Sequence, residues 1–296
     1  MKGIILAGGA GSRLYPMTRV MTKQLQSVYD KPMIYYPLSI LMLGGIKDIL
    51  LITTPDDQPL FKKLLGDGSQ FGIKLSYVIQ EKPTGLPDAF VLGEKFIGDD
   101  NVCLILGDNM FYGDLDFLRL AIKEQEEKKN GLHGRVFAYY VADPTAYGVV
   151  EFDKGTKKVK SIEEKPKQPK SNYAVPGLYL FDNTVAARAK AVKPSARGET
   201  EIVDLILSYH NEGKLGVEMM YRGLAWLDTG TPRSLLDAAA FIGAIEERQG
   251  LKVACLEEIA FRMKFITLEQ LQKITSELPK CSYRSYLEKI ITEETI

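Results

Sequence analysis

Short apolar runs alternate with longer mixed stretches through the first third of the chain. Four of these runs have the length and composition of buried strands: residues 3–7, 48–53, 74–79 and 102–106. Between them lie stretches long enough for crossover helices, at residues 33–43, 58–65 and 86–96. This alternation predicts an α/β fold with a mostly parallel central sheet and helices on both of its faces.

After an amphipathic, helix-like stretch at residues 115–129, the pattern becomes rich in strands. Strands are predicted at residues 136–141, 148–152, 159–164 and 174–181, and helices at 183–191, 199–212 and 231–247. Apolar stripes at residues 261–274 and 283–291 need a partner surface. We therefore expect a core over residues 1–230, with one part at about 1–115 and a β-rich part at about 135–230, and a C-terminal helical subdomain over residues 231–296.

The composition excludes several broad classes of protein. Lys plus Arg and Asp plus Glu both number 38, so no overall field favours nucleic acid or an anionic membrane. No apolar stretch is long enough for a signal peptide or a membrane span. Cys103, Cys255 and Cys281 lack metal-binding or disulfide-like spacing, which predicts a cytoplasmic protein. His133 and His210 stand alone, so histidine-based catalysis is not expected.

The first predicted strand leads directly into a glycine-rich segment at residues 8–15. Glycines let the backbone approach a ligand closely, and consecutive N–H groups can surround a phosphate. Arg13 and Lys23 add two cations, which favours a triphosphate over a dinucleotide. A Walker loop is absent, and the dinucleotide fingerprint would need a third glycine where Leu14 stands.

Polar residues follow two further predicted strands. Gln80 opens the segment at residues 80–86, and Asp108 follows the strand at 102–106. The carboxyl ends of parallel strands lie at one edge of a sheet, where ligands bind. Asp228, in a glycine-containing turn at residues 225–231, supplies a second carboxylate, and two such groups together with phosphate oxygens suit Mg²⁺.

Two other features could recognise a nucleoside and a sugar. The amide of Gln80 can pair with the edge of a base. Glu164 and Lys165 could bind sugar hydroxyls and a sugar phosphate. Taken singly, each motif also has a purely structural interpretation: aspartates that cap helices or form turns, a polar loop after a strand, and an exposed ion pair.

The order of these motifs resembles the sugar-nucleotide pyrophosphorylases almost from end to end. The similarity includes the glycine-rich pattern Gly-Gly-x-Gly-Ser-Arg-Leu-x-Pro and covers residues 8–16, 23–25, 28–38, 107–109, 147–150, 163–166, 173–175, 225–231 and 246–252. It implies a Rossmann-like nucleotide-diphospho-sugar transferase fold. It also implies Mg²⁺-dependent transfer of thymidylyl from dTTP to glucose 1-phosphate, as the first step towards dTDP-rhamnose or related deoxysugars, by a homo-oligomer, expected to be a tetramer.

The resemblance also implies roles for individual residues. The catalytic set is Arg13, Lys23, Asp108, Lys165 and Asp228, of which Asp108 and Asp228 would hold the metal. The nucleotide would contact Gly8, Gly11, Ser12, Arg13, Lys23, Gln24, Gln80, Pro83, Gly85, Leu86 and Asp108. The sugar phosphate would contact Asn109, Tyr147, Gly148, Glu164, Lys165, Val175 and Trp226. A second, regulatory nucleotide site would use Tyr112, Gly113, Arg222, Lys252, Glu257, Glu258 and Arg262, unless these residues only pack the C-terminal region.

The chain departs from the family pattern at a few positions. They are Gln26 and Ser27 after the Lys23 segment, Pro87 and Asp88 after Leu86, Pro176 at the sugar site, and Asp114 where a histidine is common. None removes a phosphate-binding or metal-binding group. Three alternatives stay open: the same chemistry with UTP or another sugar 1-phosphate, a non-catalytic regulatory homologue, and, as the least favoured, a dinucleotide-dependent epimerase or dehydratase, which would need a Tyr-x-x-x-Lys pair.

Overall fold

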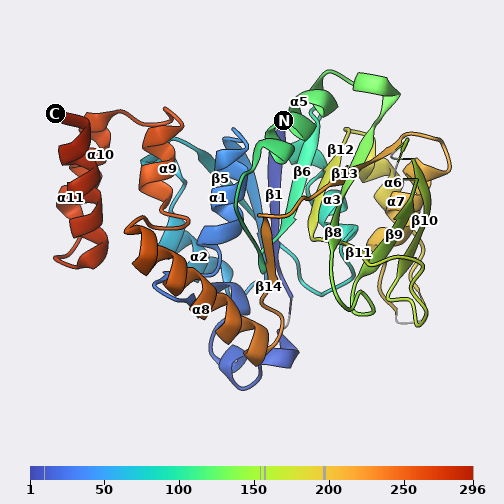
Figure 1. Cartoon of the computed structure of the whole chain (residues 1–296), viewed down its shortest axis with the longest axis horizontal. Coiled ribbons are helices and arrows are strands. Elements are labelled where there is room, and N and C mark those ends of the chain that lie inside the picture. Colours follow the sequence, from blue (N-terminus) through green and yellow to red (C-terminus); the bar gives the residue numbers. More distant parts are fainter. Residues whose placement is uncertain (10, 154, 157, 196–197, 296) are drawn as a thin grey trace.

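One continuous sheet runs through the molecule (Figure 1). The computed structural model describes residues 1–9, 11–153, 155–156, 158–195 and 198–295, so Ala10 of the glycine-rich segment lies outside the described residues. β1 (Lys2–Ala7) lies between β4 (Asp48–Thr53) and β6 (Val102–Leu106), and β5 (Lys74–Ile79) pairs with β4. All four strands are parallel, as predicted, within one residue of the expected bounds.

The other half of the sheet is mainly antiparallel. β12 (Leu178–Phe181) pairs with β6, and the order continues through β8 (Gly134–Tyr140), β11 (Tyr173–Val175), β9 (Gly148–Phe152) and β10 (Val159–Glu164), while β13 (Leu215–Met219) pairs with β8. The single strand predicted at residues 174–181 is wrong. It divides at Pro176, which has no N–H for a ladder, and the N–H of Gly177 donates to Asn109 Oδ1 at 3.0 Å.

Helices cover both faces of this sheet. Ile5 of β1 packs in the apolar cluster that contains α1 (Tyr35–Leu43), α2 (Gln58–Leu65) and α5 (Asp116–Glu126). Its neighbour Ile4 points to the opposite cluster, with α3 (Asp88–Leu92), α4 (Glu94–Ile97), α6 (Val185–Ala191) and α7 (Ile202–His210). Alternate strand residues therefore fill two separate cores. The helix predicted at residues 86–96 is instead the pair α3 and α4, interrupted at Gly93, a residue of low helix propensity.

The chain ends in a run of helices, of which the last three extend the first of these cores. α8 (Pro232–Gln249) begins with a capping box between Thr231 and Ser234 and leads to α9 (Leu256–Arg262), α10 (Leu268–Glu277) and α11 (Ser282–Thr295). Leu256, Leu271 and Leu287 pack in the same cluster as α1, and Figure 1 shows α10 and α11 at the end of the molecule beyond α9. None of the helices in the described ranges is long and apolar enough to cross a membrane.

Shorter elements complete the chain. The 3₁₀ turns are η1 (Ser12–Leu14), η2 (Met17–Arg19), η3 (Lys23–Leu25), η4 (Ser69–Phe71) and η5 (Lys129–Gly131). Two small sheets pair β2 (Ser27–Val28) with β3 (Lys31–Pro32) and β7 (Asn109–Tyr112) with β14 (Ala225–Asp228). The sequence analysis did not anticipate β7, β13 or β14.

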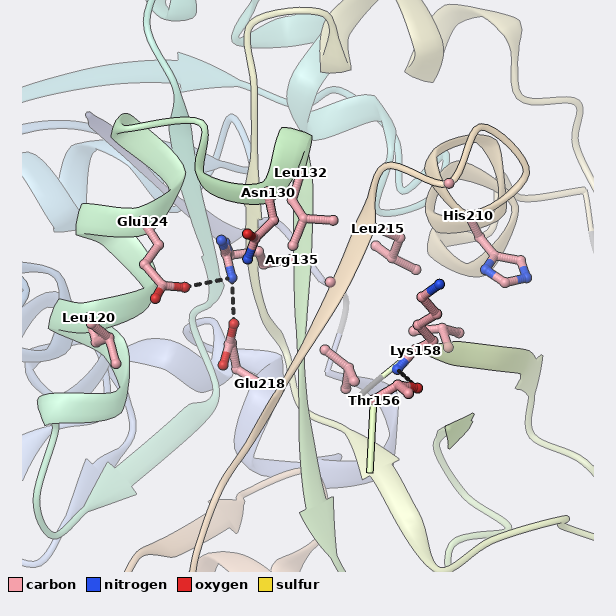
Figure 2. A pocket seen from close by; sticks show the side chains of 14 residues that line it. Leu120, Glu124, Asn130, Leu132, Arg135, Thr156, Lys158, His210, Leu215 and Glu218 are labelled. Atoms are coloured by element: carbon pink, nitrogen blue, oxygen red, sulfur yellow. Dashed lines mark hydrogen bonds and ion pairs between the residues drawn. The ribbon is translucent and has the colours of Figure 1, made fainter. Parts of the chain in front are cut away.

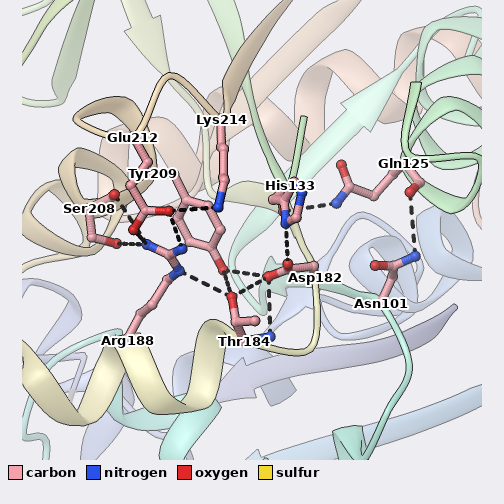
Figure 3. Close-up of polar contacts among 10 residues, drawn as sticks. All are labelled: Asn101, Gln125, His133, Asp182, Thr184, Arg188, Ser208, Tyr209, Glu212 and Lys214. Atoms are coloured by element: carbon pink, nitrogen blue, oxygen red, sulfur yellow. Dashed lines mark hydrogen bonds and ion pairs between the residues drawn. The ribbon is translucent and has the colours of Figure 1, made fainter. Parts of the chain in front are cut away.

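A buried polar network holds the β-rich half together (Figure 3). Asp182, at the end of β12, is 6% exposed and accepts hydrogen bonds from the Tyr209 hydroxyl at 3.0 Å and the Thr184 hydroxyl at 2.6 Å. Nδ1 of His133 lies 2.7 Å from its other carboxylate oxygen. The network joins β8, β12, α6 and α7, so we assign His133 a structural role.

We expect Asp182→Ala to lower the free energy of unfolding by about 2–3 kcal/mol, because the buried Tyr209 hydroxyl would lose a charged acceptor. Urea denaturation measures this change. Asp237→Ala is the matched control, since its ion pair with Arg233 is exposed on α8 and should contribute under about 1 kcal/mol. Equal losses in the two variants would show that the network has no special stabilising role.

Candidate active site

Three strand ends converge at one edge of the sheet, as the sequence predicted. β1 leads into the glycine-rich segment, β5 leads to Gln80 and β6 leads to Asp108. The N–H of Gly107 donates to the carbonyl of Leu6 at 2.9 Å, which keeps the first and third of these ends in contact. The residues that follow the strands are therefore held close together by the parallel register.

A long-range pairing brings Asp228 to the same edge. β14 runs antiparallel to β7, and Asp228 lies opposite Asn109, the neighbour of Asp108. The turn that follows is fixed by the Thr229 hydroxyl, which donates to the carbonyl of Asp108 at 2.9 Å. Asp228 thus ends a strand, whereas the sequence analysis placed it within a turn. The two predicted metal ligands lie at adjacent ends of paired strands.

The two carboxylates are held near two cations. Lys23 Nζ forms an ion pair with Asp108 Oδ2, and Asn109 Nδ2 donates to Asp108 Oδ1 at 3.1 Å. Burial raises the pKa of Asp228, and the negative charge of Asp108 raises it further, while the charges of Arg13 and Lys23 act in the opposite direction. The site therefore concentrates negative charge that a bound cation would relieve.

Two glycines shape the phosphate side of the site. Gly11 has a φ of +59°, and a Cβ added there would lie 2.7 Å from Thr18 Cγ2, so only glycine fits this turn. A Cβ added to Gly230 would lie 2.7 Å from Arg13 Nη2 and 3.0 Å from Asp228 Oδ1. Gly230 therefore leaves room for the Arg13 guanidinium beside Asp228.

We expect Gly230→Ala to lower turnover by about 10²-fold. The added methyl group would displace the Arg13 guanidinium, and a misplacement of about 1 Å can cost a factor of this size. The circular dichroism spectrum and melting temperature should change little. A suitable control is Gly155→Ala, where an added Cβ would lie 3.4 Å from Asp153 Oδ1, an ordinary van der Waals distance. Full activity of the Gly230 variant would show that the position of Arg13 does not matter.

A cavity of about 720 Å³ opens in front of these residues. It collects most of the predicted nucleotide, sugar and metal residues: Ser12, Arg13, Gly85, Leu86, Asp108, Asn109, Tyr147, Gly148, Glu164, Lys165, Val175, Trp226 and Asp228. Of the remaining predicted residues, Lys23 reaches the site through Asp108, and Gln24 is buried behind it. Gly8 and Gly11 belong to the glycine turn itself, and Gln80 packs against Gly8. Pro83 is exposed on the loop that follows Gln80.

Aromatic and charged groups form the wall opposite the glycine turn. Trp226 Nε1 donates to Asn109 Oδ1 at 2.7 Å, and the Tyr147 ring lies 5.0 Å from the Trp226 ring. Lys165, which adopts a φ of +45°, donates its backbone N–H to the carbonyl of Tyr147 at 3.0 Å and pairs with Glu164 at 3.2 Å. An apolar surface and an exposed cation thus face the cavity together, which suits a sugar that carries a phosphate.

The sequence analysis missed one side of the cavity. Glu199, Thr200 and Glu201 line it, although residues 199–212 were predicted as one helix. α7 begins only at Ile202, because the N–H and the hydroxyl of Thr200 both donate to the carbonyl of Thr84, at 2.9 and 3.0 Å, and hold this segment extended. The sequence does carry a signal for this side of the cavity: Glu199 and Glu201 directly precede the apolar run of α7.

The residues predicted for a regulatory site fall into two groups. In the first group, the Tyr112 hydroxyl donates to Gln249 of α8 at 3.3 Å, and a Cβ added to Gly113 would lie 2.7 Å from the carbonyl of Gly223, the neighbour of Arg222. The others contact the C-terminal helices: Lys252 pairs with Asp30 and Glu246, Glu257 accepts from Tyr283, Glu258 accepts from Tyr286, and Arg262 pairs with Glu294. A second nucleotide site here stays a prediction.

A second cavity, of about 730 Å³, lies among α5, β8 and β13 (Figure 2). Its main polar group is Arg135, which is 1% exposed and pairs with Glu218 and, at 3.2 Å, with Glu124. None of the residues predicted for substrate binding or catalysis lines it. Since two carboxylates already neutralise the guanidinium, we place the candidate active site in the first cavity.

Comparisons with known proteins identify relatives of this chain in sequence and in structure. The sequence model of the nucleotidyl transferase family matches residues 2–244. Glucose-1-phosphate thymidylyltransferases of Neisseria meningitidis and Mycobacterium tuberculosis are each 54% identical to this chain, over 98% of it and 99% of the relative. A solved Bacillus anthracis structure assigned as such an enzyme, in complex with sucrose, superposes with a TM-score of 0.75 at 42% identity, over 81% of this chain and 94% of that one.

A more distant structure shares the fold. A UDP-glucose pyrophosphorylase in complex with UDP-glucose superposes with a TM-score of 0.73 at 21% identity, over 84% of this chain and 99% of that one. At this identity the likeness shows the fold alone. It supports the predicted mostly parallel α/β architecture.

Proposed function

This chain belongs to the nucleotidyl transferase family, and we propose that it transfers thymidylyl from dTTP to glucose 1-phosphate, releasing dTDP-glucose and pyrophosphate. One structural observation carries the proposal. Arg13, the two aspartates and the Glu164–Lys165 pair line one cavity, although they come from distant parts of the sequence, and Lys23 contacts Asp108 beside it. A nucleotide and a sugar phosphate could thus be held side by side.

The residues at this edge fit Mg²⁺. Within the described part of the chain, no group of three or more His, Cys, Asp or Glu side chains could hold a metal. Two carboxylates are what Mg²⁺ commonly uses when substrate phosphates and water complete its shell. The raised pKa of Asp228 reflects negative charge that a cation would offset. We propose that Asp108 and Asp228 hold Mg²⁺, which when bound would supply positive charge to the phosphates.

The remaining catalytic work falls to fixed cations and orientation. The sugar phosphate is itself the nucleophile, so no side-chain base is needed, in keeping with the structural role of His133. Arg13 and Lys23 are placed to stabilise negative charge on the nucleotide phosphates, and Lys165 to hold the phosphate of the sugar. The walls of Trp226 and Tyr147 would orient the sugar so that its phosphate attacks in line.

Two alternatives differ from this proposal in testable ways. Use of UTP or of another sugar 1-phosphate would need the same residues, but the relatives at 54% identity carry the thymidylyltransferase name. A non-catalytic, regulatory homologue could dispense with one metal carboxylate, whereas this chain has both Asp108 and Asp228 at the cavity. These observations favour the hypothesis that the chain catalyses thymidylyl transfer.

A pyrophosphate-release assay over a panel of nucleotides and sugar 1-phosphates tests the function. We expect dTTP with glucose 1-phosphate to be the best pair and excess EDTA to abolish turnover, which added Mg²⁺ should restore. A better pair from the panel would replace the proposed substrates. Undiminished turnover in EDTA would refute the metal assignment.

We also propose the setting in which the enzyme works. A dTDP-sugar product is the precursor that dTDP-rhamnose or related deoxysugar synthesis would consume. Cys103 and Cys255 are buried free thiols and Cys281 an exposed one, in keeping with a reducing cytoplasm. Assembly as a homo-oligomer, expected to be a tetramer, is open to analytical ultracentrifugation.

A further inference from the structure

Asp88, the first residue of α3, contacts the residue that we expect to read the base. Gln80 Nε2 donates to Asp88 Oδ2 at 3.0 Å, and the Thr84 hydroxyl donates to the same oxygen at 2.6 Å. Asp88 is one of the departures from the family pattern, and the sequence analysis gave it no role. The structure places its carboxylate where it controls the side-chain amide of Gln80.

The contact selects one of two orientations of that amide. The oxygen and nitrogen of a glutamine amide exchange places by a half turn, at little steric cost. A carboxylate accepts hydrogen bonds and donates none, so only the orientation with the NH₂ group towards Asp88 is favoured. Asp88 therefore turns Gln80 Oε1 away from itself.

The oxygen turned away from Asp88 faces the glycine turn. A Cβ added to Gly8 would lie 2.7 Å from Gln80 Oε1, so the lack of a side chain at Gly8 is what leaves this oxygen approachable. Gln80 is 5% exposed and is not among the residues that line the cavity, whereas Gly85 and Leu86 of the same segment do line it. Among the described residues, no hydrogen bond to Gln80 Oε1 is formed.

We propose that Asp88 is a positioning residue that locks Gln80 with its acceptor towards the base, and so selects thymine or uracil over cytosine. The N3 atom of thymine and uracil carries a hydrogen and can donate to Oε1. The N3 atom of cytosine is an acceptor, so two lone pairs would face each other. This inference rests on the proposed function, because it takes Gln80 as the residue that reads the nucleotide base.

A purely structural role for Asp88 predicts a different outcome. The Thr84 contact could serve only to hold the segment at residues 80–87 in shape. Loss of that shape would weaken the binding of every nucleotide by a similar factor. Loss of the amide lock would instead change the ratio of two affinities, because an unlocked amide could rotate to offer its NH₂ group to cytosine.

Isothermal titration calorimetry of dTTP and dCTP against wild type, Asp88→Asn and Asp88→Ala provides the test. The asparagine side chain keeps the shape of Asp88 but can both accept and donate, so the two amides could turn together. We expect wild type to prefer dTTP, and the dTTP-to-dCTP affinity ratio to fall by about tenfold in both variants, the scale of one net hydrogen bond. Asp116→Asn, at the start of α5, is the matched control and should leave the ratio unchanged.

The outcomes separate this inference from the proposed reaction. An unchanged ratio in folded variants, or an equal loss for both nucleotides, would overturn the role of Asp88, as would a wild type without preference for dTTP. If wild type prefers dTTP in binding but releases no pyrophosphate with glucose 1-phosphate, the proposed reaction fails while the affinity ratios still decide the role of Asp88. Should Asp88→Asn not fold, as judged by its melting transition, Asp88→Ala decides alone.

Discussion

Asp108→Asn and Asp228→Asn should each lower turnover by at least about 10²–10³-fold, the usual cost of losing one preorganised electrostatic group. Each substitution removes a carboxylate that we expect to bind the metal while keeping the size of the side chain. Steady-state pyrophosphate release at saturating substrate measures the loss. Higher Mg²⁺ should not restore the rate, since a neutral amide is a poor substitute for a carboxylate in this shell.

A stability measurement shows whether such a loss is functional. The pKa of Asp228 is raised in the folded state, so its ionised form is disfavoured there, and stability is lost as the pH rises through the shifted range. Asp228→Asn removes this ionisation, so the metal-free variant should be at least as stable as wild type at neutral pH. A variant that is both inactive and strongly destabilised would point to misfolding. Asp237→Asn on α8 serves as the control and should keep full activity.

Lys23→Ala should produce a loss of similar size, at least about 10²-fold in turnover, because a fixed cation near the nucleotide phosphates would be gone. The same assay measures it. Lys190→Ala is the matched control, since Lys190 also pairs with a carboxylate, that of Glu94 at 2.6 Å, but on the surface. It should keep full turnover. Near-normal turnover of Lys23→Ala would remove Lys23 from the mechanism.

The pair that Lys23 forms with Asp108 adds a second expectation. The effects of substituting two groups in direct contact are not independent. The double variant Lys23→Ala/Asp108→Asn should therefore lose less turnover than the product of the two single losses. Additive losses would indicate that the two side chains act independently. The double-mutant cycle therefore tests whether the observed contact matters during turnover.

Local patterns were enough to predict the parallel half of the sheet. The four parallel strands, β1, β4, β5 and β6, are short apolar runs, and β4 and β5 begin and end where the sequence pattern does. Because parallel strands end at one edge, Gln80 and Asp108 could be placed together without a structure. The structure confirms the predicted mostly parallel α/β architecture in the pairing of β1, β4, β5 and β6.

Long-range contacts could not be predicted in the same way. Residues 225–228 form a strand only by pairing with residues more than a hundred positions earlier, and that pairing is what brings Asp228 opposite Asn109. The ion pair of Lys23 with Asp108 and the passage of Arg13 over Gly230 depend on the same tertiary contacts. The strand break at Pro176 is an exception, because proline cannot donate to a ladder and therefore marks the break in the local sequence.

A crystal structure of the protein with Mg²⁺ and dTDP-glucose would test the central claim most directly. We predict one cation bound by an oxygen of Asp108 and an oxygen of Asp228, each at about 2.0–2.1 Å, with phosphate oxygens and water completing its shell. A cation held by only one of these aspartates, or bound elsewhere while Lys23 stays on Asp108, would contradict the account.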